Sequence, residues 1–207
     1  MMTVMTVAKA PPEMWPDVWP DVWPDEDRPL TVRDMDNMPD DGNRYELDEG
    51  MLIVSPAPFH NHQWVVQRLW FILQAACLPE FVAIIGPGVN LSEFQHRIPD
   101  VAVLRSEGFQ LDEVFEERAP VLAVEVASRG TRRYDRTRKK AVYAQYGVQA
   151  YWIVSPDLDG PDITEFSLSD GRYQQAGYAA GDTEFSTKFP FPVSFTPAQL
   201  LSTEPLR

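Results

Sequence analysis

The sequence has few of the residues that build disulfide or zinc centres. Among its 207 residues there are one cysteine, Cys77, and three histidines. A single cysteine excludes an internal disulfide framework and a zinc site made of several cysteines. One unpaired thiol is also typical of a reducing cytoplasm, which is the location we expect.

Long apolar runs are missing as well. No stretch reaches the roughly 18 apolar residues that a membrane-spanning helix needs. The first residues, MMTVMTVAKAPPEM, lack the apolar core of a secretory signal. We therefore expect a soluble chain with no membrane partner. A hydrophobic content of 44% is normal for one globular domain with a packed core.

Positive charge is scarce and concentrated in one place. The net charge of −13 argues against nonspecific binding of nucleic acid by the whole surface. Residues 121–150 nevertheless hold seven basic and two acidic residues, a local net charge of +5, while the rest of the chain sums to −18. The chain thus carries one basic patch on an acidic background.

The N-terminal segment contains a tetrapeptide repeat. Residues 14–26 read MWPDVWPDVWPDE. Prolines at this spacing forbid a helix and favour an extended chain. We expect residues 1–29 to be a disordered tail and residues 30–207 to form one domain. The alternative is that the tryptophans anchor a partner protein.

Hydrophobic periodicity predicts an α/β (α+β) fold. Apolar residues recur at helical spacing in two segments, and several short apolar or alternating segments are typical of strands. The predicted elements are a hairpin about Glu49-Gly50, a long helix ending before Pro79, two short strands around Gly86-Pro87-Gly88, strands within 97–105 and 121–128, a helix over 131–147, a strand over 150–156, a hairpin about 169–171, a last strand within 191–195 and a short helix with Pro197 at its first position. A mixed β-sheet core flanked by two main helices follows.

One acid, Glu125, interrupts the apolar stretch LAVEVA. Burial of a lone charge is very costly, and no lysine or arginine lies within this strand. Asp100 begins another predicted strand after Pro99. Carboxylates on neighbouring strands would repel unless a divalent cation lay between them, and Mg²⁺ binds through one or two carboxylates. A structural acid paired with an arginine from elsewhere is the alternative.

The basic partner of Glu125 is not on its own strand. Residues i and i+2 of a strand face the same side, so a lysine beside Glu125 would most simply stand at position 127, which is alanine. The helix that follows carries a stripe at helical spacing: Arg132, Arg136, Lys139, Lys140 and Tyr143. If this helix packs on the sheet, the stripe can reach Glu125. A solvated basic face is the alternative.

These segments together resemble a known family. In order and spacing, RYELDEGMLIVSPAP, IPDVAVLR and LAVEVASRGTRRYDRTRKKAVYAQYGVQAYWIVSPD are similar to the Uma2 family, described as putative restriction endonucleases of the PD-(D/E)XK nuclease superfamily. The resemblance covers about residues 45–156. The family's PD motif matches Pro99-Asp100, its strand acid Glu125 and its helical lysine Lys139. The sequence departs from the family at Arg129-Gly130, a turn where Pro-Ser is commoner.

The resemblance implies a restriction-endonuclease-like fold with an extra N-terminal hairpin, and a metal-dependent endonuclease that hydrolyses DNA as a homodimer. Asp100, Glu125 and the Val126 carbonyl would hold Mg²⁺, for which Mn²⁺ could substitute, and Lys139 would orient or activate a water. Further roles are catalytic for Glu46, accessory for His62 and Asp135, and phosphate-binding for Arg132, Arg136 and Lys140.

Other readings stay open. A nuclease-fold module that no longer cuts and only binds nucleic acid or protein fits the acidic surface. A protein-interaction module led by the Trp-Pro repeat is a third possibility. His62 could be a hydrogen-bonded structural residue instead, and we expect His60 and His96 on the surface. Tyr151 and Trp152 are expected in the core.

Overall fold

The computed structural model describes residues 5–7, 28–56, 58, 60–109, 115–116, 119–127, 134–158 and 160–204. The chain divides into two compact units. The first unit comprises Met1–Ala57, Gly88–Ile98 and Val114–Arg118, and the second comprises Pro58–Pro87, Pro99–Glu113 and Ala119–Arg207. Within the described residues, no helix is both long and apolar enough to cross a membrane.

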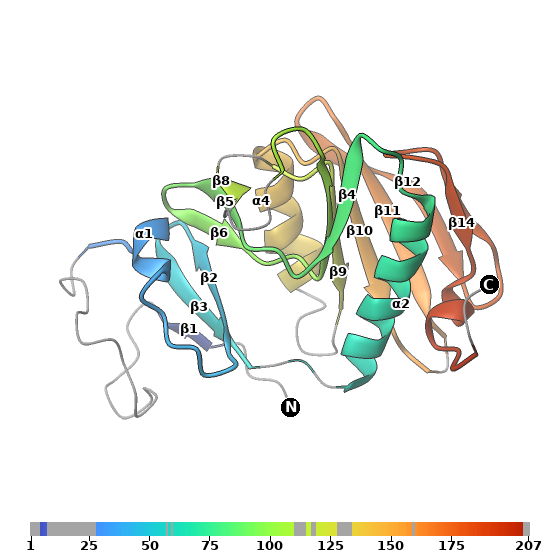
Figure 1. Ribbon diagram of the computed structural model, residues 1–207, viewed down its shortest axis with the longest axis horizontal. Coiled ribbons are helices and arrows are strands. Elements are labelled where there is room, and N and C mark those ends of the chain that lie inside the picture. The colour runs from blue at the N-terminus through green and yellow to red at the C-terminus, as the bar shows by residue number, and fades with distance from the viewer. Residues whose placement is uncertain are drawn as a thin grey trace. The chain divides into compact units, whose positions relative to one another are not determined.

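The first unit is built on one six-stranded sheet. Its strand order is β1-β3-β2-β6-β5-β8 (Figure 1). The elements are β1 (Met5–Val7), α1 (Val32–Met35), β2 (Arg44–Asp48), β3 (Met51–Ser55), β5 (Val89–Ser92), β6 (Gln95–Arg97) and β8 (Phe115–Glu116). The predicted hairpin joins β2 to β3 through Glu49 and Gly50, which both have positive φ. Gly50 tolerates this conformation because it lacks a Cβ.

The N-terminal tail is described only in part. Of residues 1–29, which the sequence predicts to be disordered, Met5–Val7 pair with β3 as an antiparallel strand. Arg28 forms an ion pair of 2.8 Å with Asp34 of α1. The Trp-Pro-Asp repeat lies outside the described residues.

The second unit contains a six-stranded sheet, referred to below as the second sheet. Its order is β12-β11-β10-β9-β7-β4. The strands are β4 (Phe81–Ile85), β7 (Val101–Arg105), β9 (Leu122–Val126), β10 (Ala150–Ser155), β11 (Asp162–Ser169) and β12 (Arg172–Ala180). Strands β9 and β10 are parallel and the other pairs are antiparallel. The predicted mixed sheet is confirmed, with β9 among its central strands.

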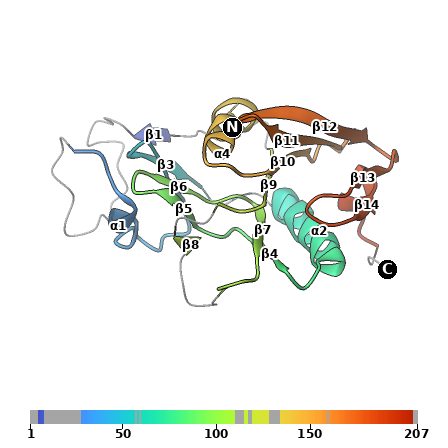
Figure 2. The same ribbon diagram turned by 90° about the horizontal axis from the view of Figure 1, so that it is seen from above.

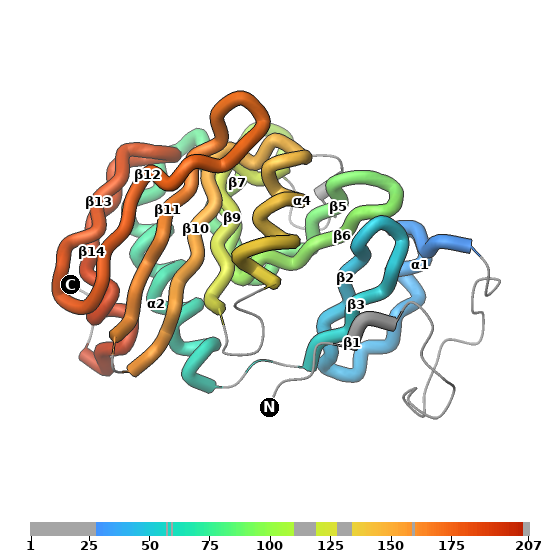
Figure 3. Tube along the Cα trace, turned by 180° about the vertical axis from the view of Figure 1, so that it is seen from behind, coloured from blue at the N-terminus to red at the C-terminus, as the bar shows by residue number. Residues whose placement is uncertain are grey.

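Helices cover both faces of the second sheet. The face of Val124 and Trp152 packs on α2 (His60–Ala76), which buries Val65, Val66, Leu69 and Leu73 against it. The opposite face carries Glu125 and is covered by a π-helical turn, η2 (Asp135–Lys139), that continues into α4 (Lys140–Gln145). Figures 2 and 3 show α4 and α2 on opposite sides of this sheet. Because side chains alternate between the two faces along each strand, the sheet presents apolar side chains toward α2 and some polar side chains, such as that of Glu125, toward α4.

The remaining elements of the second unit are β13 (Phe185–Thr187), β14 (Val193–Phe195) and the 3-10 turn η3 (Pro197–Leu200). β14 and η3 contact α2, and β13 pairs with β14 and contacts β12. Phe185 and Phe195 join the core that α2 shares with the second sheet. The predicted last strand is confirmed as β14, and the short helix predicted from Pro197 forms as the 3-10 turn η3. The sequence did not predict β6, β8 or β13, which have two or three residues each.

One pair of predicted strands is separated by the fold. The sequence gives two short strands around Gly86-Pro87-Gly88. Both form, but β4 pairs with β7 in the second sheet, whereas β5 pairs with β6 and β8 in the sheet of the first unit. Local pattern identifies a strand, while its partner depends on distant segments of the chain.

Candidate active site

Asp100 and Glu125 come from neighbouring segments at one end of the antiparallel strands β7 and β9. Val101 of β7 is opposite Val124 of β9. Asp100 immediately precedes Val101, and its Oδ2 atom accepts the backbone N–H of Val126, the residue that follows Glu125, at 2.8 Å. Both side chains are buried, with relative exposures of 4%.

The Glu125 carboxylate receives a donor on each oxygen. The Lys139 ammonium lies 2.9 Å from Oε2, and the Tyr143 hydroxyl donates to Oε1 at 2.9 Å. Lys139 is itself buried. A buried carboxylate in an apolar strand is thus stabilised by a cation and a hydroxyl from the helical segment that covers it.

The helical segment presents Lys139 and Tyr143 on one face, since they are four residues apart. The segment is fixed to the sheet by aromatic packing. The rings of Tyr143 and Tyr151 lie 5.2 Å apart, and the Tyr151 hydroxyl donates to the Asp135 carbonyl at 3.0 Å. Burial, with the charges of Glu125 and Asp135 nearby, raises the pKa of Tyr151 well above its usual range, so this hydroxyl keeps its proton.

Asp100 is held by contacts of a different kind. Its Oδ2 atom accepts the Val126 backbone N–H at 2.8 Å and lies 3.0 Å from His62 Nε2. His62 stands in the first turn of α2. Its other ring nitrogen, Nδ1, is buried and has no hydrogen-bond partner within the described part of the chain. The imidazole therefore contacts the candidate site through one nitrogen and leaves the second available to a ligand or a water.

The predicted phosphate-binding residues differ in their surroundings. Arg136 is exposed at the start of the helical segment. The Lys140 ammonium lies 3.5 Å from the centre of the Phe166 ring, and burial lowers the pKa of Lys140. This cation–π contact aims Lys140 toward β11. Arg132 falls outside the described residues.

Three further residues of the predicted site are Asp135, Val126 and Glu46. Asp135 is buried in the π-helical turn near Lys139. Val126 contacts Asp100 through its amide N–H, whereas the sequence predicts a metal contact through its carbonyl. Glu46 belongs to the first unit, where it is buried in β2 and accepts the Ile98 backbone N–H at 2.8 Å. Its role beside the other acids stays a prediction.

Sequence reasoning missed polar residues that the structure places in buried positions. His96, which the sequence predicts on the surface, is buried, and its Nδ1 lies 2.6 Å from Asn90 Oδ1. That prediction is wrong because the polar segment QHR forms strand β6 inside the first unit. Arg97 of the same strand is fully buried and pairs with Asp48 at 2.8 Å. Tyr143 was placed on the basic stripe, but no local signal marked its bond to Glu125.

The donors present fit magnesium better than zinc. Mg²⁺ is typically bound by one or two carboxylates and keeps several waters for a phosphate substrate. Asp100 and Glu125 supply two buried carboxylates from neighbouring segments of the second sheet. Across the described ranges, no cluster of three or more histidine, cysteine, aspartate or glutamate side chains is suited to a metal ion. A zinc site built from several protein ligands therefore has no support in the described part of the chain.

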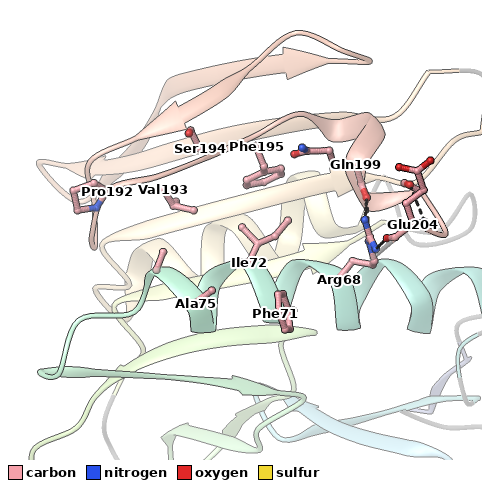
Figure 4. Close-up of a pocket in the computed structure, with 12 residues that line it drawn as sticks. Arg68, Phe71, Ile72, Ala75, Pro192, Val193, Ser194, Phe195, Gln199 and Glu204 are labelled. Carbon is pink, nitrogen blue, oxygen red and sulfur yellow. Dashed lines mark hydrogen bonds between the residues drawn. The ribbon is translucent and has the colours of Figure 1, made fainter. Parts of the chain in front are cut away.

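A pocket elsewhere in the second unit holds none of these residues. It lies between α2 and β14, has a volume of about 720 Å³ and is lined by Phe71, Ile72 and Phe195 among others (Figure 4). Arg68 lines one end, where its guanidinium donates to the backbone carbonyls of Gln199 and Glu204. No predicted site residue points into this pocket.

Comparisons with known proteins identify the family of the chain and match its fold. The family model of Uma2, described as "Putative restriction endonuclease", matches residues 32–201. Among solved structures, the chain is similar to a protein from Anabaena variabilis ATCC 29413 described as "a putative nuclease belonging to DUF820". The TM-score is 0.64 at 16% identity, over 84% of this chain and 98% of that one. The predicted nuclease-like fold is confirmed. A comparison with curated proteins found no match.

Proposed function

The chain belongs to the Uma2 family, and on that premise we propose that it is a Mg²⁺-dependent endonuclease that hydrolyses phosphodiester bonds of DNA. The family and the fold support a nuclease. The metal, the DNA substrate and the roles of individual residues are our proposal.

One observation carries the proposal: the buried triad of Asp100, Glu125 and Lys139. Asp100 is bound to the backbone N–H of Val126, the residue after Glu125, and the Lys139 ammonium lies 2.9 Å from Glu125 Oε2. A purely structural acid needs one cation and no second carboxylate. Two acids and a lysine brought together in this way suit metal-assisted phosphodiester hydrolysis.

In this reading Asp100, Glu125 and the Val126 carbonyl hold the metal. Bound Mg²⁺ would lower the pKa of a water and neutralise charge on the scissile phosphate. The Lys139 ammonium, held by Glu125, supplies a fixed positive charge where negative charge develops in the transition state. The contact to Val126 N–H keeps Asp100 oriented in the sheet, and His62 restrains the same oxygen from α2.

In this proposal, the basic residues of the helical segment bind the nucleic acid substrate. Arg136 is exposed beside the triad, and Lys140 and Arg132 follow the same stripe in the sequence. Cations of this kind contact phosphates and fix the register of a nucleic acid without reading its sequence. Cutting both strands of a duplex calls for two such centres, so we expect the active form to be a homodimer.

Cleavage of supercoiled plasmid and of single-stranded DNA tests the proposal. The protein is assayed with Mg²⁺, with Mn²⁺ and with a chelator, beside Asp100→Asn and beside Glu184→Gln as an exposed-acid control. We expect cleavage with either metal, none with the chelator, none by Asp100→Asn and full activity in Glu184→Gln. Absence of cleavage by the unmutated protein on both substrates with both metals would contradict the proposal.

The second candidate function is a binding module that no longer cuts. The net charge of −13 favours it, because a freely acting DNA nuclease gains from a positive surface. The two hypotheses differ in one measurement. A binding module is expected to retain DNA in a mobility-shift assay or a partner protein in solution while leaving the DNA intact in every metal.

A further inference from the structure

The hydroxyl of Tyr143 contacts the candidate site directly. The side chain is fully buried, at 0% relative exposure, and its hydroxyl donates to Glu125 Oε1 at 2.9 Å. Tyr143 stands on α4, one turn beyond Lys139. The sequence places this residue on the stripe that faces Glu125 but predicts no role for it in the site.

We propose that Tyr143 is a positioning residue that fixes the rotation of the Glu125 carboxylate for metal binding. An ionised carboxylate has two oxygens and about four lone-pair positions. Lys139 engages Oε2 and Tyr143 engages Oε1, so neither oxygen can turn without losing a bond. The remaining lone pairs keep one direction, and groups that hydrogen-bond a ligating carboxylate in this way orient it toward its metal.

The surroundings of Tyr143 explain why its hydroxyl stays in place. The ring packs 5.2 Å from that of Tyr151, which packs in turn 5.8 Å from that of Tyr173. Tyr151 is fastened to the helical segment by its bond to the Asp135 carbonyl. The phenol therefore has little freedom to rotate, because the aromatic cluster packs the helical segment against β10 and β12.

The inference rests on the proposed function, since it takes Glu125 to be a metal ligand. It adds that a residue which never touches metal or substrate sets the affinity for the metal. Loss of such a partner commonly weakens metal binding by about 10–100-fold. Tyr143→Phe removes only the hydroxyl oxygen and leaves the ring packed against Tyr151.

Tyr173→Phe provides a matched control. Tyr173 belongs to the same aromatic cluster, but its hydroxyl donates to the Val148 carbonyl at 2.7 Å and makes no contact with Glu125. Both variants lose one buried or half-buried phenol bond. Near-ultraviolet circular dichroism and thermal unfolding check that the cluster remains packed in each.

The test is calorimetric titration with Mn²⁺ alone, followed by DNA cleavage over a range of Mn²⁺ concentrations. For Tyr143→Phe we expect a Kd about 10–100-fold higher and a matching shift of the half-maximal Mn²⁺ concentration, with most of the rate regained at saturation. Tyr173→Phe is expected to match the unmutated protein. A damaged fold would instead lower the rate at every Mn²⁺ concentration and alter the dichroism.

Three outcomes overturn the inference, and they are distinguishable. If the unmutated protein binds Mn²⁺ and cleaves, and Tyr143→Phe has the same Kd, then Tyr143 does not position Glu125 and the proposed function stands. If the unmutated protein neither binds Mn²⁺ nor cleaves, the proposed function fails and the inference fails with it. A rate loss in Tyr143→Phe at saturating Mn²⁺ without any change in Kd also contradicts it.

Discussion

The ammonium group of Lys139 lies 2.9 Å from the Glu125 carboxylate, although fourteen positions separate the two residues along the chain. The strand supplies the acid and the helical segment that covers the strand supplies the base. Position 127, where a lysine would share the strand face of Glu125, is a buried alanine. A lysine on the helical segment brings the same charges together while position 127 of the strand stays apolar.

Removal of the Lys139 charge is expected to cost both activity and stability. Lys139→Met keeps most of the side-chain length but leaves the Glu125 carboxylate buried without its cation. Breaking a buried pair from one side typically destabilises a protein by about 3–5 kcal/mol. We expect the free energy of unfolding in urea to fall by about this amount and cleavage to be lost.

Two further variants accompany Lys139→Met, one as a control and one to measure the coupling between Lys139 and Glu125. Lys188→Met, at an exposed position, is expected to change neither quantity. The double variant Lys139→Met with Glu125→Gln removes both charges and is expected to regain part of the stability but none of the activity. Normal cleavage by Lys139→Met would contradict the role of Lys139 and leave it as a structural partner.

His62 is expected to matter for activity through its contact with Asp100. His62→Ala removes the nitrogen 3.0 Å from Asp100 Oδ2 and frees the carboxylate on the α2 side. We expect cleavage to fall by about 10–100-fold, the range found when a partner of a ligating group is lost. His60→Ala, two residues earlier and exposed, is the control. Equal activity in the two variants would assign His62 a structural role.

The buried pair of Arg97 and Asp48 is expected to stabilise the first unit only as a pair. Arg97 is fully buried, and its Nη2 lies 2.8 Å from Asp48 Oδ1. Arg97→Met removes the guanidinium from the buried Asp48 carboxylate and is expected to cost about 3–5 kcal/mol. Urea unfolding of Arg97→Met, of Asp48→Asn and of the double variant measures the coupling, with exposed Arg172→Met as control. A double variant as unstable as the sum of the singles would contradict the pairing.

Acid is expected to destabilise the first unit through His96. Burial, reinforced by Arg97, lowers the pKa of His96 from its ordinary value of 6.5, while Glu46 and Asp36 act in the opposite direction. The unfolded chain then binds more protons than the folded one as the pH falls through 6.5. The free energy of unfolding should therefore decrease over this interval and level off below the folded pKa.

His96→Gln provides the comparison for that pH profile. The variant has no group that titrates at this position, so its free energy of unfolding between pH 5 and pH 8 is expected to be flatter than that of the unmutated protein. His60→Gln, an exposed control, should keep the slope. An unchanged slope in His96→Gln would place its origin in another residue.

Much of the fold could be predicted because its elements have strong local signals. The α2 helix shows apolar residues at helical spacing, the β2–β3 hairpin turns at Glu49-Gly50, and the β11–β12 hairpin turns at Asp170-Gly171, where both residues have positive φ. Which strands pair with one another was harder to predict than the strands themselves. β4 and β5 are neighbours in the sequence yet belong to different sheets, and β6 is a three-residue polar strand without a periodic pattern.

For the candidate site, residue types and order could be predicted but contacts could not. Strand alternation indicated that Glu125 and Ala127 share a face, and helical spacing grouped Lys139 with Tyr143. The expected α-helix is instead a π-helical turn over Asp135–Lys139, a form often found at functional sites. Such a turn changes the direction of each side chain, so the bonds of Lys139 and Tyr143 to Glu125 had to be observed.

The most direct test of the central claim compares two buried acids of the second sheet. Glu125 faces the helical segment. Glu165 of β11 faces α2, where it accepts a bond of 2.8 Å from Thr187. Glutamine at either position keeps the shape and removes the charge. Plasmid cleavage with Mn²⁺ and calorimetric Mn²⁺ binding are measured for Glu125→Gln, Glu165→Gln and the unmutated protein. We expect Glu125→Gln to lose both cleavage and Mn²⁺ binding while Glu165→Gln keeps both. Cleavage and Mn²⁺ binding by Glu125→Gln at the level of the unmutated protein would contradict the claim that Glu125 forms a metal-dependent nuclease centre.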